Sequence, residues 1–302
     1  NPNDNNEKEK MPIHRLLSAI KNLDELKTIV LMGTDIDTVK NDKIISWSEF
    51  IAMGESVDEN DIIKRMDNIQ KEDTCSLIYT SGTTGNPKGV ELTHNNFKVE
   101  LDSVSQVLKF NQGEKYLSWL PLAHVFGQLV DNHYWIRRAL HMSIVDSPLN
   151  TVDYAKEIQP HLFISVPRIY EKIYSNLKAA IDSKLILKIG LKIPWLSIIF
   201  KNKLKEAAGF SNNRFSISGA APINPDILKL FQSIGIPLFE GYGMTENTAG
   251  ISINFYGNNK IGSVGKCMPF FDLKIADDGE VLIKGDNVMK GYYNNPKATS
   301  ET

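Results

Sequence analysis

The chain alternates between stretches with apolar residues at helical spacing and short apolar runs rich in β-branched residues. Residues 13–26 have helical spacing, and residues 28–33 (TIVLMG) predict a buried strand that ends at a glycine. Another buried strand is predicted at residues 75–80 (CSLIYT), before a glycine-rich loop. Helical spacing resumes at Asn95, which is suited to cap the helix. The predicted order in this region is therefore strand, loop, helix.

Further apolar runs predict more buried strands, with helical stretches between most of them. They lie at residues 116–122, 141–146, 161–166, 214–219 and 236–243. This alternation predicts an α/β fold, with layered, largely parallel sheets and helices. Pro167 is expected to begin an amphipathic helix after the third run. From about residue 260, two short strands around Asp278-Gly279 predict a hairpin and the start of a smaller antiparallel β unit.

Composition narrows the class of protein without changing the fold prediction. The 302 residues are 42% hydrophobic and 23% charged, which is ordinary for a globular protein with a buried core. A net charge of -2 provides no overall basic field for nucleic acid. Cys75 and Cys267 lack Cys-x-x-Cys spacing, which favours a reducing compartment and a cytoplasmic location. Apolar runs in the sequence fall short of the roughly 20 residues that span a bilayer.

Residues 79–94, YTSGTTGNPKGVELTH, combine glycines, hydroxyl side chains and one lysine. The glycines allow several N–H groups to converge on an anion, while the hydroxyls and the lysine add donors and positive charge. This pattern predicts polyphosphate binding, with a surface turn as the alternative. The spacing excludes a Walker A loop, because Asn86-Pro87 precede the lysine and Gly89 follows it. The predicted phosphate-binding residues are Thr80, Ser81, Gly82, Thr83, Thr84, Gly85 and Lys88.

This loop resembles the signature loop of adenylate-forming (AMP-binding) enzymes, which include acyl-CoA synthetases, luciferases and the adenylation domains of peptide synthetases. Three other segments resemble motifs of that superfamily in the same order: residues 216–223 (SISGAAPI), residues 239–246 (FEGYGMTE) and the final stretch from Gly279. Within the superfamily, residues 120–128 (LPLAHVFGQ) and 163–177 (FISVPRIYEKIYSNL) are similar to long-chain fatty acid–CoA ligases. The resemblance extends over residues 23–302.

The resemblance implies ATP-dependent activation of a long-chain fatty acid to an acyl-adenylate and then to acyl-CoA, with Mg²⁺ as the metal and CoA as a co-substrate. It assigns Glu246 as the Mg²⁺ ligand and places Thr245, His124 and Lys88 beside it in catalysis. Tyr242 would lie against adenine. The remaining residues implied to bind nucleotide are Gly219, Ala220, Ala221, Glu240, Gly241 and Gly243, together with Thr245.

Several of these positions also have a plainer structural interpretation. Glu246 could cap a helix, Tyr242 could pack on the core, and residues 219–221 could form only a tight turn. His124 could be a buried core histidine. The neighbouring Trp119 and Phe126 would either line an acyl tunnel or fill the core.

The resemblance also divides the chain, with residues 1–256 in the large AMP-binding domain and residues 257–302 in its β-rich subdomain. The ribose-binding aspartate, the hinge and the mobile C-terminal domain with its catalytic lysine are expected beyond Thr302. We therefore interpret the chain as a central fragment, expected to bind nucleotide weakly and to make no acyl-CoA by itself. Adenylation of an aromatic or amino acid and a non-catalytic nucleotide-binding module stay open as alternative functions.

The segment from Lys184 to Lys205 contains six lysines and no acidic residue. Lys184, Lys188 and Lys192 are four residues apart, which predicts one helical face next to apolar side chains. Our hypothesis is peripheral contact with an anionic intracellular membrane, and the alternative is a solvated lysine stripe on a packed helix. Acyl chain length and oligomeric state are left open by the sequence.

Overall fold

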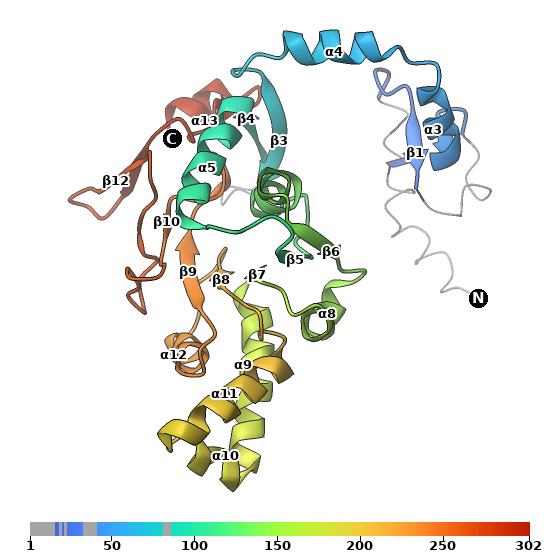
Figure 1. Cartoon of the computed structure of the whole chain (residues 1–302). Helices are drawn as coiled ribbons and strands as arrows, with labels where there is room; N and C mark the ends of the chain where they lie inside the picture. The colour runs from blue at the N-terminus through green and yellow to red at the C-terminus, as the bar shows by residue number, and fades with distance from the viewer. Residues whose placement is uncertain (1–15, 18–19, 21–22, 33–40, 81–85) are drawn as a thin grey trace, which may run out of the picture. The chain divides into compact units, whose positions relative to one another are not determined.

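A computed structural model of the chain describes residues 16–17, 20, 23–32, 41–80 and 86–302, and its secondary structure is shown in Figure 1. The chain divides into two compact units, Asn1–Ile69 and Gln70–Thr302. The division expected between residues 256 and 257 stays a prediction.

The first unit contains a small parallel sheet and two helices. Strand β1 (Ile29–Leu31) pairs with β2 (Ile44–Ser46), so the predicted strand forms. The side chains of β1 are only half-buried, so the expected burial of this strand was wrong. The helices α3 (Trp47–Gly54) and α4 (Glu59–Asn68) contribute no buried residue. Of the helix predicted at residues 13–26, residues 16–17 are helical and residues 23–26 form a turn, while residues 13–15, 18–19 and 21–22 lie outside the described residues.

The second unit is built on a seven-stranded sheet with the order β11-β10-β9-β8-β7-β5-β6. Two short antiparallel strands, β10 (Ser252–Ile253) and β11 (Lys266–Cys267), extend one edge. The other five strands are parallel and coincide with the five predicted runs: β5 (Lys115–Ser118), β6 (His141–Ile144), β7 (Leu162–Ser165), β8 (Phe215–Ser218) and β9 (Leu238–Tyr242). The prediction of a largely parallel α/β sheet is confirmed. β7 and β8 are fully buried, whereas β6 is not, because it forms the sheet edge.

The central strands separate two hydrophobic clusters. On β7, Phe163 packs into one cluster while Leu162 and Ile164 pack into the other, because successive side chains of a strand point to opposite faces. The sheet is therefore covered on both faces, as a layered α/β fold requires. The helices at the first cluster are α8 (Thr151–Ile158), α9 (Pro167–Ser183), α11 (Pro194–Ala208) and α12 (Pro225–Ser233). Those at the second are α5 (His94–Val107), the π-helix η3 (Gln128–Tyr134) and α7 (Trp135–Arg138).

The glycine-rich loop connects two strands of a smaller sheet. β3 (Thr74–Thr80) pairs antiparallel with β4 (Lys88–Thr93), and β14 (Gly291–Tyr292) pairs with the other edge of β4. The predicted order of strand, loop and helix was wrong because it omitted β4. The partner strand β14 lies far along the chain, so the local pattern does not reveal this pairing.

Helix α5 begins one residue before the predicted cap. Thr93, not Asn95, is the N-cap, because the Thr93 hydroxyl accepts a hydrogen bond from the Asn96 N–H at 3.2 Å. The Asn96 side chain in turn accepts from the Thr93 N–H at 2.7 Å. This reciprocal capping box fixes the start of the helix directly after β4.

The predicted hairpin near the end of the chain is confirmed. β12 (Asp272–Ile275) pairs antiparallel with β13 (Val281–Lys284) across the turn at Asp278-Gly279. Gly279 has a φ of 91°, a conformation that residues with a side chain rarely adopt. The final helix, α13 (Pro296–Ser300), follows β14.

The lysine-rich segment forms two helices instead of one. α9 begins at Pro167 as predicted and ends before Lys184, whose backbone is extended (φ −121°, ψ 104°). α10 spans only Leu185–Gly190, and Lys192 lies in the turn before Pro194, which begins α11. The prediction that Lys184, Lys188 and Lys192 share one helical face was wrong, because Lys184 separates α9 from α10. Lys192 lies before α11, whose first turn contains Pro194. Within the residues that the structure describes, helices fall short of the length and apolarity needed to cross a bilayer.

Candidate active site

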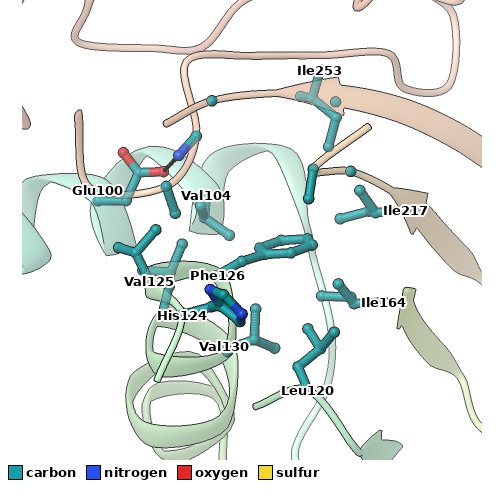
Figure 2. A pocket seen from close by; sticks show the side chains of 18 of the residues that line it. Glu100, Val104, Leu120, His124, Val125, Phe126, Val130, Ile164, Ile217 and Ile253 are labelled. Atoms are coloured by element: carbon teal, nitrogen blue, oxygen red, sulfur yellow. Dashed lines mark hydrogen bonds between the residues drawn. The ribbon is translucent and has the colours of Figure 1, made fainter. Parts of the chain in front are cut away.

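A cavity of about 510 Å³ lies beside the carboxyl ends of β7, β8 and β9, where parallel sheets commonly bind ligands. Its wall also includes α5 and residues 119–130. Most of the lining is apolar, and Figure 2 shows the Phe126 ring in the middle of the labelled side chains. Labelled apolar residues around it include Val104, Val130, Ile164, Ile217 and Ile253.

Small residues form the wall at the ends of β8 and β9. A Cβ atom added to Gly219 would lie 3.3 Å from Phe126 Cε1, and one added to Gly243 would lie 1.5 Å from the Ala249 carbonyl oxygen. Any residue other than glycine at position 219 or 243 would therefore fill or distort this part of the wall. Ala220 and Ala249 have φ angles of 66° and 95°, so strained backbone also borders the cavity.

The structure brings together most of the residues that the FEGYGMTE and SISGAAPI segments contribute. Glu240 is buried behind the wall, where its Oε1 accepts a hydrogen bond from the Ile223 N–H at 3.3 Å. Ala221 is exposed, and neither Ala221 nor Glu240 belongs to the described lining. The predicted residues that do line the cavity are His124, Gly219, Ala220, Gly241, Tyr242, Gly243 and Thr245.

Trp119 and Phe126 both line the cavity and also pack against the second hydrophobic cluster. The Trp119 indole N–H donates to the Ile164 carbonyl oxygen at 2.9 Å, which fixes the ring in the wall. Trp119 and Phe126 thus combine cavity lining with core packing, and the acyl tunnel stays a prediction. His124 is exposed where the chain enters the short helix α6 (Val125–Gly127), so it is not a buried core histidine.

Lys88 of the glycine-rich loop and Glu246 of the FEGYGMTE segment both contact Tyr292. Lys88 Nζ is 4.9 Å from the centre of the Tyr292 ring, and the Tyr292 hydroxyl donates to Glu246 Oε1 at 2.7 Å. Burial and the neighbouring Glu246 carboxylate raise the pKa of Tyr292, so its hydroxyl stays protonated as the donor. Tyr292 joins Lys88 and Glu246 into one polar cluster.

The two ends of the glycine-rich loop are held together by the hairpin. Thr80 pairs with Lys88 in the β3–β4 register, which places both residues at the base of the loop. The predicted phosphate-binding residues Ser81, Gly82, Thr83, Thr84 and Gly85 lie outside the described residues. Their role stays a prediction.

Two buried acids next to the site did not emerge from the sequence. Glu100 on α5 lines the cavity, and its Oε1 accepts a hydrogen bond from the Gly250 N–H at 3.1 Å. Asp131 on the π-helix accepts hydrogen bonds from the Tyr116 hydroxyl and, at 2.8 Å, from the Ser118 hydroxyl. Burial raises the pKa of both carboxyl groups. For Glu100, the available signal was an acid within the helix predicted from Asn95.

The carboxylate of Glu246 is the candidate metal ligand. Among the described residues, His, Cys, Asp and Glu side chains do not gather in groups of three or more that could hold a metal ion. A single carboxylate suits Mg²⁺, which commonly keeps several waters and binds one or two carboxylates together with substrate phosphates. The donor chemistry of Glu246 thus fits Mg²⁺ delivered with a nucleotide.

Two curated relatives show what the chain is similar to. It is 33% identical to the long-chain-fatty-acid–CoA ligase FadD15 of Mycobacterium bovis over 284 residues, covering 82% of this chain and 45% of that protein. It is 29% identical to the peroxisomal long chain acyl-CoA synthetase 7 of Arabidopsis thaliana over 327 aligned residues, covering 96% of this chain and 44% of that protein. The chain therefore spans less than half the length of these relatives.

Solved structures share the fold. The anthranilate CoA ligase AuaEII in complex with anthranoyl-AMP superimposes with a TM-score of 0.74 at 20% identity, covering 96% of this chain and 52% of that chain. The match to the family of AMP-binding enzymes extends over residues 7–293. Because this match includes both the cavity wall and the Lys88, Tyr292 and Glu246 cluster, the chain belongs to the AMP-binding enzyme family.

Proposed function

We propose that the complete protein activates long-chain fatty acids with ATP and transfers them to CoA. The observation that carries this proposal is the apolar cavity, whose wall continues into the motif residues Tyr242 and Thr245. An apolar space next to a nucleotide site suits an acid with a long hydrocarbon chain. The names of the two curated relatives support a fatty acid over an aromatic or amino acid.

The proposed reaction has two steps. The fatty carboxylate attacks the α-phosphorus of ATP and pyrophosphate leaves, and the CoA thiol then attacks the acyl-adenylate carbonyl and AMP leaves. Lys88 would provide positive charge for the phosphates, and His124 at the cavity wall would face the acid's carboxylate. Glu246 would hold Mg²⁺, which would supply positive charge to the phosphates. Tyr292 holds the Glu246 carboxylate through its hydroxyl.

The test is acid-dependent exchange of labelled pyrophosphate into ATP by the complete protein. We expect exchange to rise with chain length, because each buried CH₂ contributes about 0.8 kcal/mol. Aromatic and amino acids serve as the comparison set. If only aromatic or amino acids support exchange, the protein activates another class of carboxylic acid and the proposal is wrong. If the protein binds nucleotide but shows no exchange with any acid, it is a non-catalytic nucleotide-binding module.

We also propose that α10 and α11 contact an anionic membrane surface, which would supply the lipid substrate. Figure 1 shows both helices next to α9, with which they are in contact. Leu185 and Trp195 are 71% and 69% exposed, and several exposed apolar side chains within one segment favour an interaction surface. Further exposed apolar residues of the segment are Ile186, Ile189, Ile198 and Ile199. The interspersed lysines provide the charge complementary to anionic headgroups.

Replacing Lys184 and Lys192 together with glutamine is expected to weaken binding to phosphatidylserine vesicles about 30-fold. Each lysine near such a surface contributes about 1 kcal/mol, which falls as salt screens it. Sedimentation with vesicles measures the change. The matched control replaces the exposed Lys229 and Lys274, which lie on α12 and β12. Binding that ignores both salt and anionic lipid would contradict the proposal.

A further inference from the structure

The turn that carries Glu246 has an unusual backbone. The short helix η5 (Thr245–Asn247) ends at Thr248, and both Thr248 and Ala249 are left-handed, with φ angles of 60° and 95°. Two successive residues with side chains in this conformation are costly, so neighbouring groups must hold them there. The groups that hold this turn also fix the position of Glu246.

Asn287 is one of these groups. Its side chain is fully buried, and its Nδ2 donates to the Asn247 carbonyl oxygen at 3.1 Å. The Asn287 carbonyl oxygen accepts a hydrogen bond from the Thr248 hydroxyl at 2.6 Å. The segment on either side of Asn287 is tied to α5, because Asn96 Nδ2 donates to the carbonyl oxygens of Asp286 and Val288 at 2.7 and 2.9 Å.

Glu100 is the second group, and it reaches the turn from α5. Its side chain is also fully buried, and its Oε1 accepts the Gly250 N–H at the end of the turn. Burial is the largest influence on this carboxyl group and raises the pKa of Glu100 well above its usual range, against the lowering effects of the Gly250 N–H and the Asn287 side chain. The groups that act on the carboxyl from the two neighbouring segments, the Gly250 N–H and the Asn287 amide, carry no charge.

Two buried oxygen atoms in this cluster, Glu100 Oε2 and Asn287 Oδ1, lack a hydrogen-bond donor among the described residues. Asn287 cannot resolve this by exchanging its amide atoms, because Nδ2 is needed as a donor to backbone carbonyl oxygens. A proton on the carboxyl group turns one of the two acceptors into a donor for the other. The Glu100 hydroxyl can then donate to Asn287 Oδ1, while Asn287 Nδ2 keeps its backbone acceptors.

We propose that Glu100 is a positioning residue that acts as a neutral carboxylic acid, pairing with Asn287 to hold the Glu246 turn against α5. The pair connects three segments far apart in the sequence: α5, the turn after β9 and the stretch before β14. Its effect on the reaction rests on the proposed acid activation. Its protonation and its hold on the turn do not depend on that function.

The experiment compares Glu100→Gln with Glu100→Leu in the complete protein. Glutamine reproduces a neutral acid, because one atom accepts from Gly250 and the other donates to Asn287 Oδ1. Leucine has a similar size and leaves both partners unpaired. We expect the pyrophosphate exchange rate of Glu100→Gln to stay within about twofold of the unchanged protein. Glu100→Leu should lose about 10-fold, mainly because its KM for MgATP rises more than its KM for the fatty acid. Equal losses in both variants, or no loss in Glu100→Leu, would overturn the proposal.

Two further measurements decide the proposal independently of activity. The infrared difference between the unchanged protein and Glu100→Gln at neutral pH should contain the band of a protonated carboxyl group, and a carboxylate band would overturn it. Amide hydrogen exchange of residues 245–250 should be faster in Glu100→Leu and unchanged in Glu100→Gln. If Glu100→Leu does not fold, the infrared result and the activity of Glu100→Gln decide. If the unchanged protein shows no acid-dependent pyrophosphate exchange, that result would count only against the proposed function.

Discussion

Replacing Glu246 with glutamine is expected to lower acid-dependent pyrophosphate exchange by about 100-fold or more. Glutamine has the same size and still offers an oxygen to the Tyr292 hydroxyl, so the variant removes mainly the negative charge. A bound metal stabilises developing charge by several kcal/mol, and each 1.36 kcal/mol corresponds to a factor of ten in rate. The measurement is the exchange rate at saturating fatty acid over a range of Mg²⁺ concentrations, where the variant should need more Mg²⁺.

Two control variants separate the charge of Glu246 from its surroundings. Tyr292→Phe removes the hydroxyl donor but keeps the ring next to Lys88, and a loss of about 10-fold is expected because the group acts only through the ligand. Glu280→Gln removes a charge from the exposed β12–β13 hairpin and should leave exchange unchanged. If Glu246→Gln exchanges pyrophosphate as fast as Glu280→Gln, the Glu246 carboxylate is not the Mg²⁺ ligand.

The five parallel strands of the central sheet could be predicted because each is a local feature. β7 and β8 are short apolar runs bounded by turns, and their burial depends on little beyond that pattern. The pairing of β4 with β14 could not be predicted, because it joins residues about 200 positions apart. The break at Lys184 was missed for a related reason, since lysine spacing alone does not show where α9 ends.

The residues of the candidate site also fall into two groups, those that a sequence motif identifies and those that only the structure reveals. Tyr242 and Thr245 were identified through their motif, and the structure places both on the cavity wall. Tyr292 and Glu100 were not singled out, because their roles arise from contacts with Glu246 and Gly250 in distant parts of the chain. A motif identifies residues that meet the ligand more readily than residues that hold other residues in place.

Replacing Val104 with phenylalanine is expected to lower exchange with the longest fatty acids about 200-fold relative to acids four carbons shorter. Figure 2 shows Val104 on α5 close to the Phe126 ring, within the cavity lining. A phenyl group there would occupy space needed by several methylenes. Excluding four CH₂ groups at about 0.8 kcal/mol each costs about 3 kcal/mol, which corresponds to about 200-fold. The measurement is the ratio of kcat/KM values over a series of saturated acids.

The shape of this response distinguishes a blocked chain site from general damage. Ile136→Phe makes the same kind of enlargement on α7, where the side chain is 62% exposed, and should leave the ratio unchanged. A Val104→Phe variant that lowers exchange equally for every acid would mean that the hydrocarbon chain does not enter this cavity. Because the small-residue wall at β8 and β9 would still suit a nucleotide, that result would separate the two halves of the site: nucleotide binding would stand, and the acyl chain would have to lie elsewhere.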